Sequence, residues 1–308
     1  MRLVFAGTPA AAGPSLRRLA ASDHHVAAVI TRPDAPLGRK RVLTPSPVAA
    51  VADELAIPVI RAARLDDEAT ARITALEPEL GVIVAYGGLV REPLLSAPRH
   101  GWINLHFSLL PAWRGAAPVQ HALIAGDRVT GASVFRLVPE LDAGDVLGER
   151  RYDVPQTATA SDVLAALAES GADLLADVLD AIAAGTAQAR PQTGRPTFAP
   201  KLTIADGALD WTQPADRVLD RFRGVTPEPG AHTTVDGLRV KVLAAERGLP
   251  DAAGPLAPGR ITAARTGVLV GTATTPVLVT RVQPAGKAAM AATDWWRGLR
   301  ADDPVAGS

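Results

Sequence analysis

The sequence contains no cysteine among its 308 residues. This absence excludes disulfide bonds, thiolate metal sites and a cysteine nucleophile. Acidic and basic residues are equal in number, 32 of each, so the overall charge gives no sign of a nucleic-acid or membrane partner. No apolar run approaches the roughly 20 residues of a membrane span, and the start of the chain lacks a signal-peptide core. These absences predict a soluble, cytoplasmic protein.

Several familiar motifs are also missing. The first predicted strand is followed by Gly7-Thr8-Pro9 and not by GxGxxG, so a dinucleotide fingerprint is not supported, and there is no P-loop. The six histidines show no HExxH or comparable ligand spacing. We therefore expect no metal site.

Over the first 185 residues, short apolar runs alternate regularly with helical stretches. This alternation predicts an α/β fold with a Rossmann-like, open and mostly parallel sheet. Ligands in such sheets bind beyond the carboxyl ends of the strands. The predicted strands are Leu3–Ala6, Val26–Thr31, Pro58–Ile60, Leu80–Ala85, Trp102–His106, Ala132–Leu137 and Val146–Val154, and the helices are Pro14–Ala21, Val48–Leu55, Asp66–Leu76, Ala116–Ala125 and Thr159–Ala184.

The composition changes near Gln188, where prolines and a glycine become frequent. We expect a first domain over residues 1–187, a linker over 188–204 and a second domain over 205–308. The second domain begins with a predicted helix, Pro214–Phe222, and continues with five short strands that suggest a small β-barrel. These strands are His232–Val235, Arg239–Ala244, Gly259–Ala264, Gly267–Gly271 and Pro276–Val282.

The segment Ile103–Pro118 is the richest in residues that could take part in catalysis. Asn104 and His106 are two residues apart, so on a strand their side chains share one face near its carboxyl end. An amide or a protonated imidazole can stabilise a developing oxyanion, and an imidazole can move a proton lost by an amine. The pair suits transfer of a one-carbon acyl group to an amine. A capped strand end with a structural histidine is the alternative.

Asp142 is a second candidate, in the segment Leu141-Asp142-Ala143-Gly144-Asp145. An Asp near a Gly often marks only a turn. The functional interpretation is a carboxylate that orients His106 and raises the pKa of its imidazole.

The loop Arg32–Arg41 carries four basic residues and one acidic residue. Its proline and glycine content suggests a flexible loop with little regular structure. It follows the second strand, so it lies near the expected site and could contact phosphates of a nucleic acid. A solvated surface loop is the alternative.

The segments INLHFSLLPAWRGAAPVQHAL and VPELDAGDVL resemble the folate-dependent formyltransferases. FAGTP, RPDAPLGRKRVLTPSPV, VAYGG, TFAPKLTIADGALDW and VQPAGKAAM fit the branch of that family that acts on an aminoacylated initiator tRNA. The resemblance covers nearly the whole chain. One departure is Phe107, because the family usually has a proline after the catalytic histidine.

The resemblance implies transfer of a formyl group from 10-formyltetrahydrofolate to the amino group of initiator methionyl-tRNA. It implies that Asn104, His106 and Asp142 are catalytic, and that Ser108, Leu109, Leu110 and Pro111 help to hold the folate. It further implies that Arg39, Lys40 and Arg41 contact the tRNA and that the second domain is an OB-like, tRNA-binding barrel. We expect a monomer that needs no metal.

Two other interpretations remain open at this point. A related folate enzyme could formylate an amino sugar or another small amine, or could hydrolyse the cofactor. A non-catalytic RNA-binding protein could have kept a degenerate enzyme fold, and Phe107 is the feature that favours this possibility.

Overall fold

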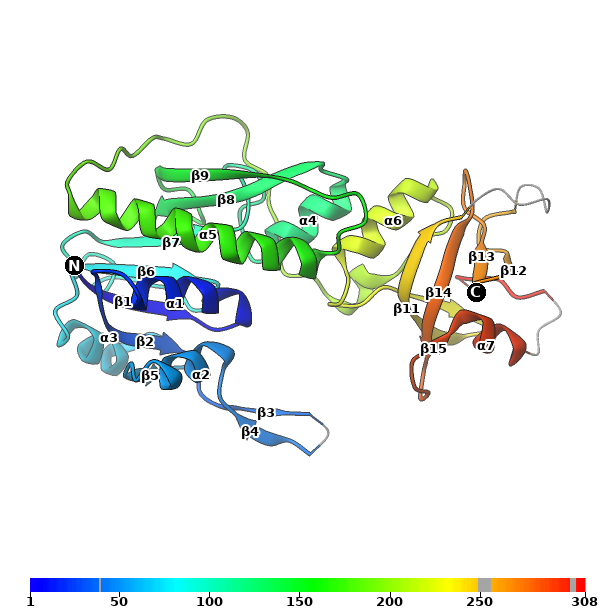
Figure 1. Cartoon of the computed structure of the whole chain (residues 1–308), viewed down its shortest axis with the longest axis horizontal. Coiled ribbons are helices and arrows are strands. Elements are labelled where there is room, and N and C mark those ends of the chain that lie inside the picture. The colour runs from blue at the N-terminus through cyan, green and yellow to red at the C-terminus, as the bar shows by residue number, and fades with distance from the viewer. Residues whose placement is uncertain (39, 249–255, 300–302, 308) are drawn as a thin grey trace. The chain divides into compact units, whose positions relative to one another are not determined.

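The computed structural model describes residues 1–38, 40–248, 256–299 and 303–307. The chain forms two compact units (Figure 1). The first contains residues 1–118, 129–153 and 164–199, and the second contains residues 119–128, 154–163 and 200–308. Within the described residues, no helix is both long and apolar enough to cross a bilayer.

The first unit is built on a seven-stranded sheet in the order β5-β2-β1-β6-β7-β8-β9. Five strands are parallel and the last two pairings are antiparallel. The central strands are almost entirely buried, which explains why their sequences are continuous apolar runs. The strands are β1 (Arg2–Gly7), β2 (His25–Thr31), β5 (Val59–Arg61), β6 (Leu80–Val84), β7 (Trp102–His106), β8 (Val129–Arg136) and β9 (Val146–Asp153).

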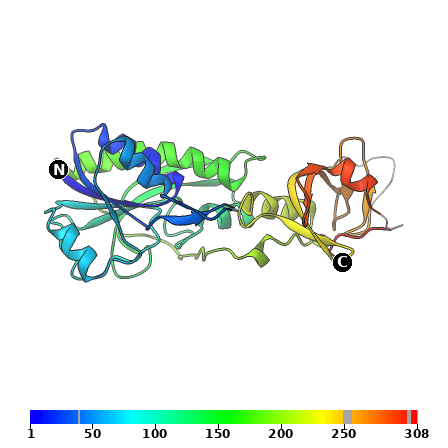
Figure 2. The ribbon, with the colours of Figure 1, turned by 90° about the horizontal axis from the view of Figure 1, so that it is seen from below.

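Helices cover both faces of this sheet. Figure 2 shows α1, α2 and α5 on one face and α3 on the other. Two helices begin where the sequence provides a cap: Ser46 accepts a hydrogen bond from the Ala49 amide and Asp66 accepts one from the Ala69 amide, both at 3.0 Å. The helices are α1 (Gly13–Ala20), α2 (Pro47–Glu54), α3 (Asp67–Thr74), α4 (Pro118–Ala125) and α5 (Ala160–Ala183), with a short 3₁₀ turn at Ala10–Ala12.

The predicted loop Arg32–Arg41 is corrected by the structure. A short antiparallel hairpin, β3 (Ala35–Leu37) paired with β4 (Val42–Thr44), projects from the sheet (Figure 1). Gly38 near its tip has a φ of 70°, a left-handed conformation that glycine adopts without steric cost. A run with so many turn-forming residues gave no alternation from which the two strands could be recognised.

The second unit contains an antiparallel sheet in the order β10-β11-β14-β13-β12, with β15 also paired to β14. It curls into a half-barrel (Figure 2). The prediction of a Rossmann-like sheet followed by a small barrel is therefore confirmed. The elements are a 3₁₀ turn (Ile204–Gly207), α6 (Ala215–Gly224), β10 (His232–Val235), β11 (Leu238–Arg247), β12 (Ile261–Ala263), β13 (Val268–Val270), β14 (Val277–Pro284), β15 (Met290–Ala291) and α7 (Ala292–Arg297).

The core of the second unit forms between this sheet and helix α6. Val218 and Phe222 of α6 are buried with Trp211, and the partly buried Trp295 and Trp296 of α7 pack against the same cluster. The indole Nε1 of Trp211 donates a hydrogen bond to Thr233 at 2.9 Å, so the polar atom of this large ring is satisfied.

Candidate active site

The site is built at the carboxyl end of β7. Asn104 and His106 lie on one face of this strand because successive side chains alternate. β7 pairs with β6 on one side, with Asn104 opposite Ile83, and with β8 on the other, with His106 opposite Ser133. Both residues therefore project from a rigid, central part of the sheet.

His106 is deeply buried, with 6% of its surface exposed. Its Nε2 lies 2.9 Å from the carbonyl oxygen of Trp113, and its ring meets the ring of Phe135 edge to face at 6.3 Å between centroids. A carbonyl can only accept a hydrogen bond, so this contact assigns the proton to Nε2 and leaves the lone pair on Nδ1.

Nδ1 of His106 faces Asp142, whose Oδ2 is 3.8 Å away. Burial lowers the pKa of the His106 imidazole, and this outweighs the opposing effects of the Asp142 carboxylate and of the Trp113 carbonyl, which both raise it. The Asp142 carboxylate acts in the direction that the sequence predicted, and burial of the ring, which the sequence did not reveal, determines the net direction. Burial thus favours the uncharged form of the imidazole.

Asp142 comes from the loop between β8 and β9. Its backbone is left-handed, with a φ of 46°, a conformation that Asp tolerates better than most residues. Its Oδ2 accepts a hydrogen bond from the backbone amide of Gly115 at 2.7 Å. The structure thus brings Asp142 to His106 from a distant part of the sequence.

Asn104 has an unmet hydrogen bond. Its Oδ1 is buried and has no partner among the described residues. A buried amide oxygen without a partner is costly. Four other buried side-chain atoms of the described residues share this state, on Ser15, Tyr86, Thr130 and Arg239. What sets Asn104 apart is its position on the same strand face as His106, where a polar group from outside the protein could meet its oxygen.

The segment from Ser108 to Pro111 forms a tight turn after β7. Ser108 and Leu110 are buried, whereas Leu109 and Pro111 are half-buried. The Ser133 hydroxyl donates to the Ser108 carbonyl oxygen and accepts from the Leu110 amide. The turn is therefore held by its backbone, and only Leu109 and Pro111 offer partly exposed side chains.

The basic residues of the predicted loop belong to the hairpin that follows the carboxyl end of β2. Lys40 and Arg41 are exposed beside its tip, and Arg39 lies outside the described residues. The base of the hairpin is tied down by a hydrogen bond of 2.7 Å between the Thr31 and Ser46 hydroxyls and by an ion pair of 3.0 Å between Arg61 and Asp34.

The segment 190–199 was predicted only as a linker, but it belongs to the site. Arg190 pairs through its backbone with Val146, and Thr197 with Arg114. The side chain of Gln192 donates to the carbonyl oxygens of Asp142 and Gly144. Its proline-rich composition contained no signal of this role, since the contacts join residues far apart in the chain.

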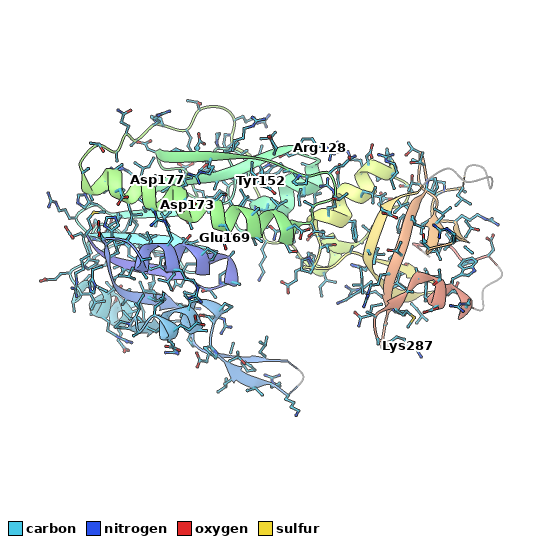
Figure 3. All side chains as sticks on the ribbon, viewed as in Figure 1. Arg128, Tyr152, Glu169, Asp173, Asp177 and Lys287 are labelled. Carbon is cyan, nitrogen blue, oxygen red and sulfur yellow. The ribbon has the colours of Figure 1, made fainter. Side chains whose placement is uncertain are left out.

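Other acidic residues are engaged in surface ion pairs. Figure 3 shows Glu169, Asp173 and Asp177 along α5. Arg18 lies 3.3 Å from Asp173, and Arg150 lies 3.5 Å from Asp177. Within the described parts of the chain, no group of three or more His, Cys, Asp or Glu side chains could hold a metal ion.

Comparison with known proteins gives a consistent picture. The formyl transferase family matches residues 1–179 and the formyl transferase C-terminal domain matches residues 201–300. The chain is 65% identical to a methionyl-tRNA formyltransferase of Clavibacter sepedonicus, over 99% of this chain and 100% of the relative. It is 64% identical to one of Leifsonia xyli, over 97% of each. The structure of HypX from Aquifex aeolicus in complex with tetrahydrofolic acid has a similar fold, with a TM-score of 0.65 at 17% identity over 96% of this chain and 46% of that one. The chain belongs to the formyl transferase family.

Proposed function

We propose that this chain transfers a formyl group from 10-formyltetrahydrofolate to the free amino group of initiator methionyl-tRNA, giving N-formylmethionyl-tRNA for translation initiation. The observation that carries the proposal is the meeting of His106 and Asp142 beside an amide, Asn104, whose buried oxygen lacks a partner. The match of both domains along the chain and the names of its relatives support the same activity.

The folate fits the residues of this site. Leu141 is 54% exposed and adjoins Asp142 in sequence. Exposed apolar side chains of this kind suit a flat heterocycle, and convergent polar groups then fix its orientation. We propose that Ser108, Leu109, Leu110 and Pro111 help to hold the folate, chiefly through the shape of their turn. When bound, the folate supplies the formyl group that the amine attacks.

We propose that Asn104 acts on both partners of the reaction. Its Nδ2 donates to the formyl oxygen as negative charge develops there, and its unpartnered Oδ1 accepts from the attacking amine. The amine must be uncharged to attack. Free α-amino groups have a pKa of about 7.7–8.0, and esterification lowers it, so the neutral form is available near pH 7.

His106 is the proposed proton carrier. Burial favours the neutral ring, so the Nδ1 lone pair can take up the proton that the amine loses. His106 can then return this proton to the folate nitrogen as its bond to the formyl carbon breaks, which releases tetrahydrofolate. Asp142, whose Oδ2 is 3.8 Å from Nδ1, stabilises the resulting cation and keeps the ring oriented. This assignment uses neither a thiol nor a metal.

We propose that Arg39, Lys40 and Arg41 contact the tRNA backbone and that the half-barrel domain binds the same molecule. We keep the predicted domains, residues 1–187 and 205–308, with the connecting segment 188–204, of which residues 190–199 pair with the loops of the first unit. We also propose that the chain works as a monomer in the cytoplasm. Size-exclusion chromatography and light scattering of the purified protein test the oligomeric state.

A formyl-transfer assay tests the function directly. Purified protein is given labelled 10-formyltetrahydrofolate with one of three acceptors: methionyl initiator tRNA, free methionine or an amino sugar. We expect label only on the tRNA. Label on the sugar would favour a different formyltransferase, and label on none of them would indicate a binding protein without this activity.

A further inference from the structure

Gln192 lies in the segment that joins the two halves of the active site. The loop 111–117 supplies the Trp113 carbonyl that binds His106, and the loop 137–145 supplies Asp142. The chain from Arg190 to Ala199 pairs with both loops. Arg190 and Val146 exchange two backbone hydrogen bonds of 2.9 and 2.8 Å. The Arg114 amide donates to the Thr197 carbonyl at 2.9 Å, and the Ala199 amide donates to the Arg114 carbonyl at 2.8 Å.

The side chain of Gln192 uses its full hydrogen-bonding capacity between these loops. Nε2 donates to the carbonyl oxygens of Asp142 at 2.8 Å and of Gly144 at 2.9 Å. Oε1 accepts from Nε and Nη2 of Arg114, at 3.1 and 2.7 Å. A primary amide offers two N–H donors and an oxygen with two lone pairs, so all four are engaged. A side chain with only donors or only acceptors could not replace it.

The conformation of Asp142 explains why such a clamp is needed. An L-residue with a φ of 46° is strained relative to the right-handed alternative, by about 1–2 kcal/mol. The two bonds from Gln192 hold the backbone carbonyls on and just after this residue. Its carboxylate is then free to accept from the Gly115 amide and to face His106.

Arg114 provides the other anchor. Only 8% of its surface is exposed, and its Nη1 lies 3.6 Å from Glu140 in the Asp142 loop. A nearly buried guanidinium needs acceptors, and the Gln192 oxygen meets two of its N–H groups. Arg114 and Gln192 thus form one hydrogen-bonded unit that spans the loops of His106 and of Asp142.

We propose that Gln192 is a positioning residue for the transfer reaction, which holds the left-handed Asp142 backbone in place so that the carboxylate faces His106. The inference rests on the proposed function of the site. All four hydrogen bonds of Gln192 are made within the protein, so we assign it no part in binding either substrate. Its loss therefore lowers the rate of the chemical step and leaves the substrate-binding constants unchanged.

The test uses Gln192→Met in the full-length protein, because methionine keeps the length of the side chain and removes all four hydrogen bonds. Displacing a catalytic group by about 1 Å can cost on the order of 100-fold in rate, so we expect kcat to fall about 10- to 100-fold. The KM for each substrate should stay within about twofold of the wild-type value. Thr193 is an exposed neighbour of Gln192 in the chain. Thr193→Ala is therefore the matched control, and we expect its kcat and KM to equal those of the wild type.

A double-mutant cycle separates positioning from a general structural effect. In an Asp142→Ala background, Gln192→Met should change kcat by less than about twofold, because the group that it positions is already absent. An equal loss of kcat in both backgrounds would overturn the proposal. So would a wild-type kcat in Gln192→Met, or a change confined to KM.

Gln192→Glu covers the case in which the methionine variant does not fold. It keeps an acceptor for Arg114, but its second carboxylate oxygen faces the Asp142 and Gly144 carbonyls and repels them. For Gln192→Glu we expect a loss of kcat at least as large as for Gln192→Met. The thermal midpoint of unfolding should stay close to that of the wild type, which shows that the variant is folded. A wild-type kcat in this folded variant would refute the proposal. A wild-type protein that transfers no formyl group would instead refute the proposed function, so the two failures are distinct.

Discussion

Among the residues that the structure describes, each unit has a pair of acidic and basic side chains that are largely shielded from solvent, and the two pairs differ. In the second unit, Asp220 and Arg223 of α6 are both about 95% buried and are joined by a direct charged hydrogen bond. Arg223 also donates to the Ala158 carbonyl at 3.3 Å. In the first unit, Nδ1 of His106 and Oδ2 of Asp142 are 3.8 Å apart, which is too far for a hydrogen bond.

The difference separates a structural pair from a candidate catalytic one. Asp220 and Arg223 form a direct ion pair within one turn of a helix, so each charge is compensated by the other. Burial favours the neutral form of His106, Asp142 has a left-handed backbone, and the neighbouring Asn104 has an orphaned oxygen. Unmet hydrogen bonds and strain that gather at one place indicate a site kept ready for substrate at some cost in stability.

The largest effect expected is on catalysis. His106→Ala and Asn104→Ala should each lower kcat by about 10²–10⁴-fold, because they remove a proton carrier and an oxyanion donor. The dissociation constant for tRNA, measured by filter binding, should change by less than about twofold. Near-normal turnover of His106→Ala would show that the pair of His106 and Asp142 is not catalytic, and that it does not differ in function from the pair of Asp220 and Arg223.

Breaking the buried ion pair of the second unit should lower the free energy of unfolding. Asp220→Ala leaves the Arg223 cation buried without its partner, which costs about 3–5 kcal/mol in the free energy of unfolding. The exposed pair of Asp216 with Arg247 provides the matched control, and Asp216→Ala should cost less than about 1 kcal/mol. Urea denaturation measures both. Equal losses in the free energy of unfolding would show that burial does not determine how much each ion pair contributes to stability.

The exposed charges of the hairpin should act only through the nucleic acid. Replacing Arg39, Lys40 and Arg41 together by Ala removes up to three phosphate contacts, and each contact contributes about 0.7–0.9 to the slope of log Kd against log salt concentration. That slope should fall by up to about 2–3, with little change in the free energy of unfolding. The control is Arg17→Ala, since Arg17 of α1 is paired with Glu54 of α2. An unchanged slope in the triple variant would exclude contact between these residues and tRNA.

The smallest effect expected is a pH dependence of stability. The pKa of an unfolded histidine is about 6.5, and burial lowers that of His106 in the folded state. As the pH falls below about 6.5, the unfolded chain takes up a proton that the folded protein does not, so stability is lost, by at most about 1.4 kcal/mol per pH unit. The loss between pH 7 and pH 5.5 should be smaller in His106→Asn. An identical loss in both proteins would contradict the neutral imidazole.

Much of the fold could be predicted from local sequence. Strand β7 was predicted with its observed ends, and so was β10, because buried runs and Asp-Gly turns are short-range signals. In the turn between β10 and β11, Asp236 and Gly237 have φ values of 51° and 72°, the left-handed pair that such hairpins favour. The hairpin of β3 and β4 was missed because turn-forming residues masked its pairing.

The catalytic candidates divide in the same way. The i, i+2 spacing placed Asn104 and His106 on one strand face, which is a local property of β-structure. Asp142 was proposed as the partner of His106, but spacing could not place the two together, and the contacts of Gln192 were not predicted, since both depend on how distant loops fold onto β7. The direction of the pKa shift at His106 also required the fold, because it reflects how deeply the ring is buried.

The sequence by itself determined the alternation of elements, the two-domain composition and the residue types available for acyl transfer, since periodicity and turn chemistry act over a few residues. Only the tertiary structure decided which of those residues meet. Burial favours the neutral form of His106, Asp142 faces it, and a glutamine from the presumed linker holds that aspartate. Contacts between residues far apart in the chain depend on the packing of the whole first unit, and no local pattern contains that information.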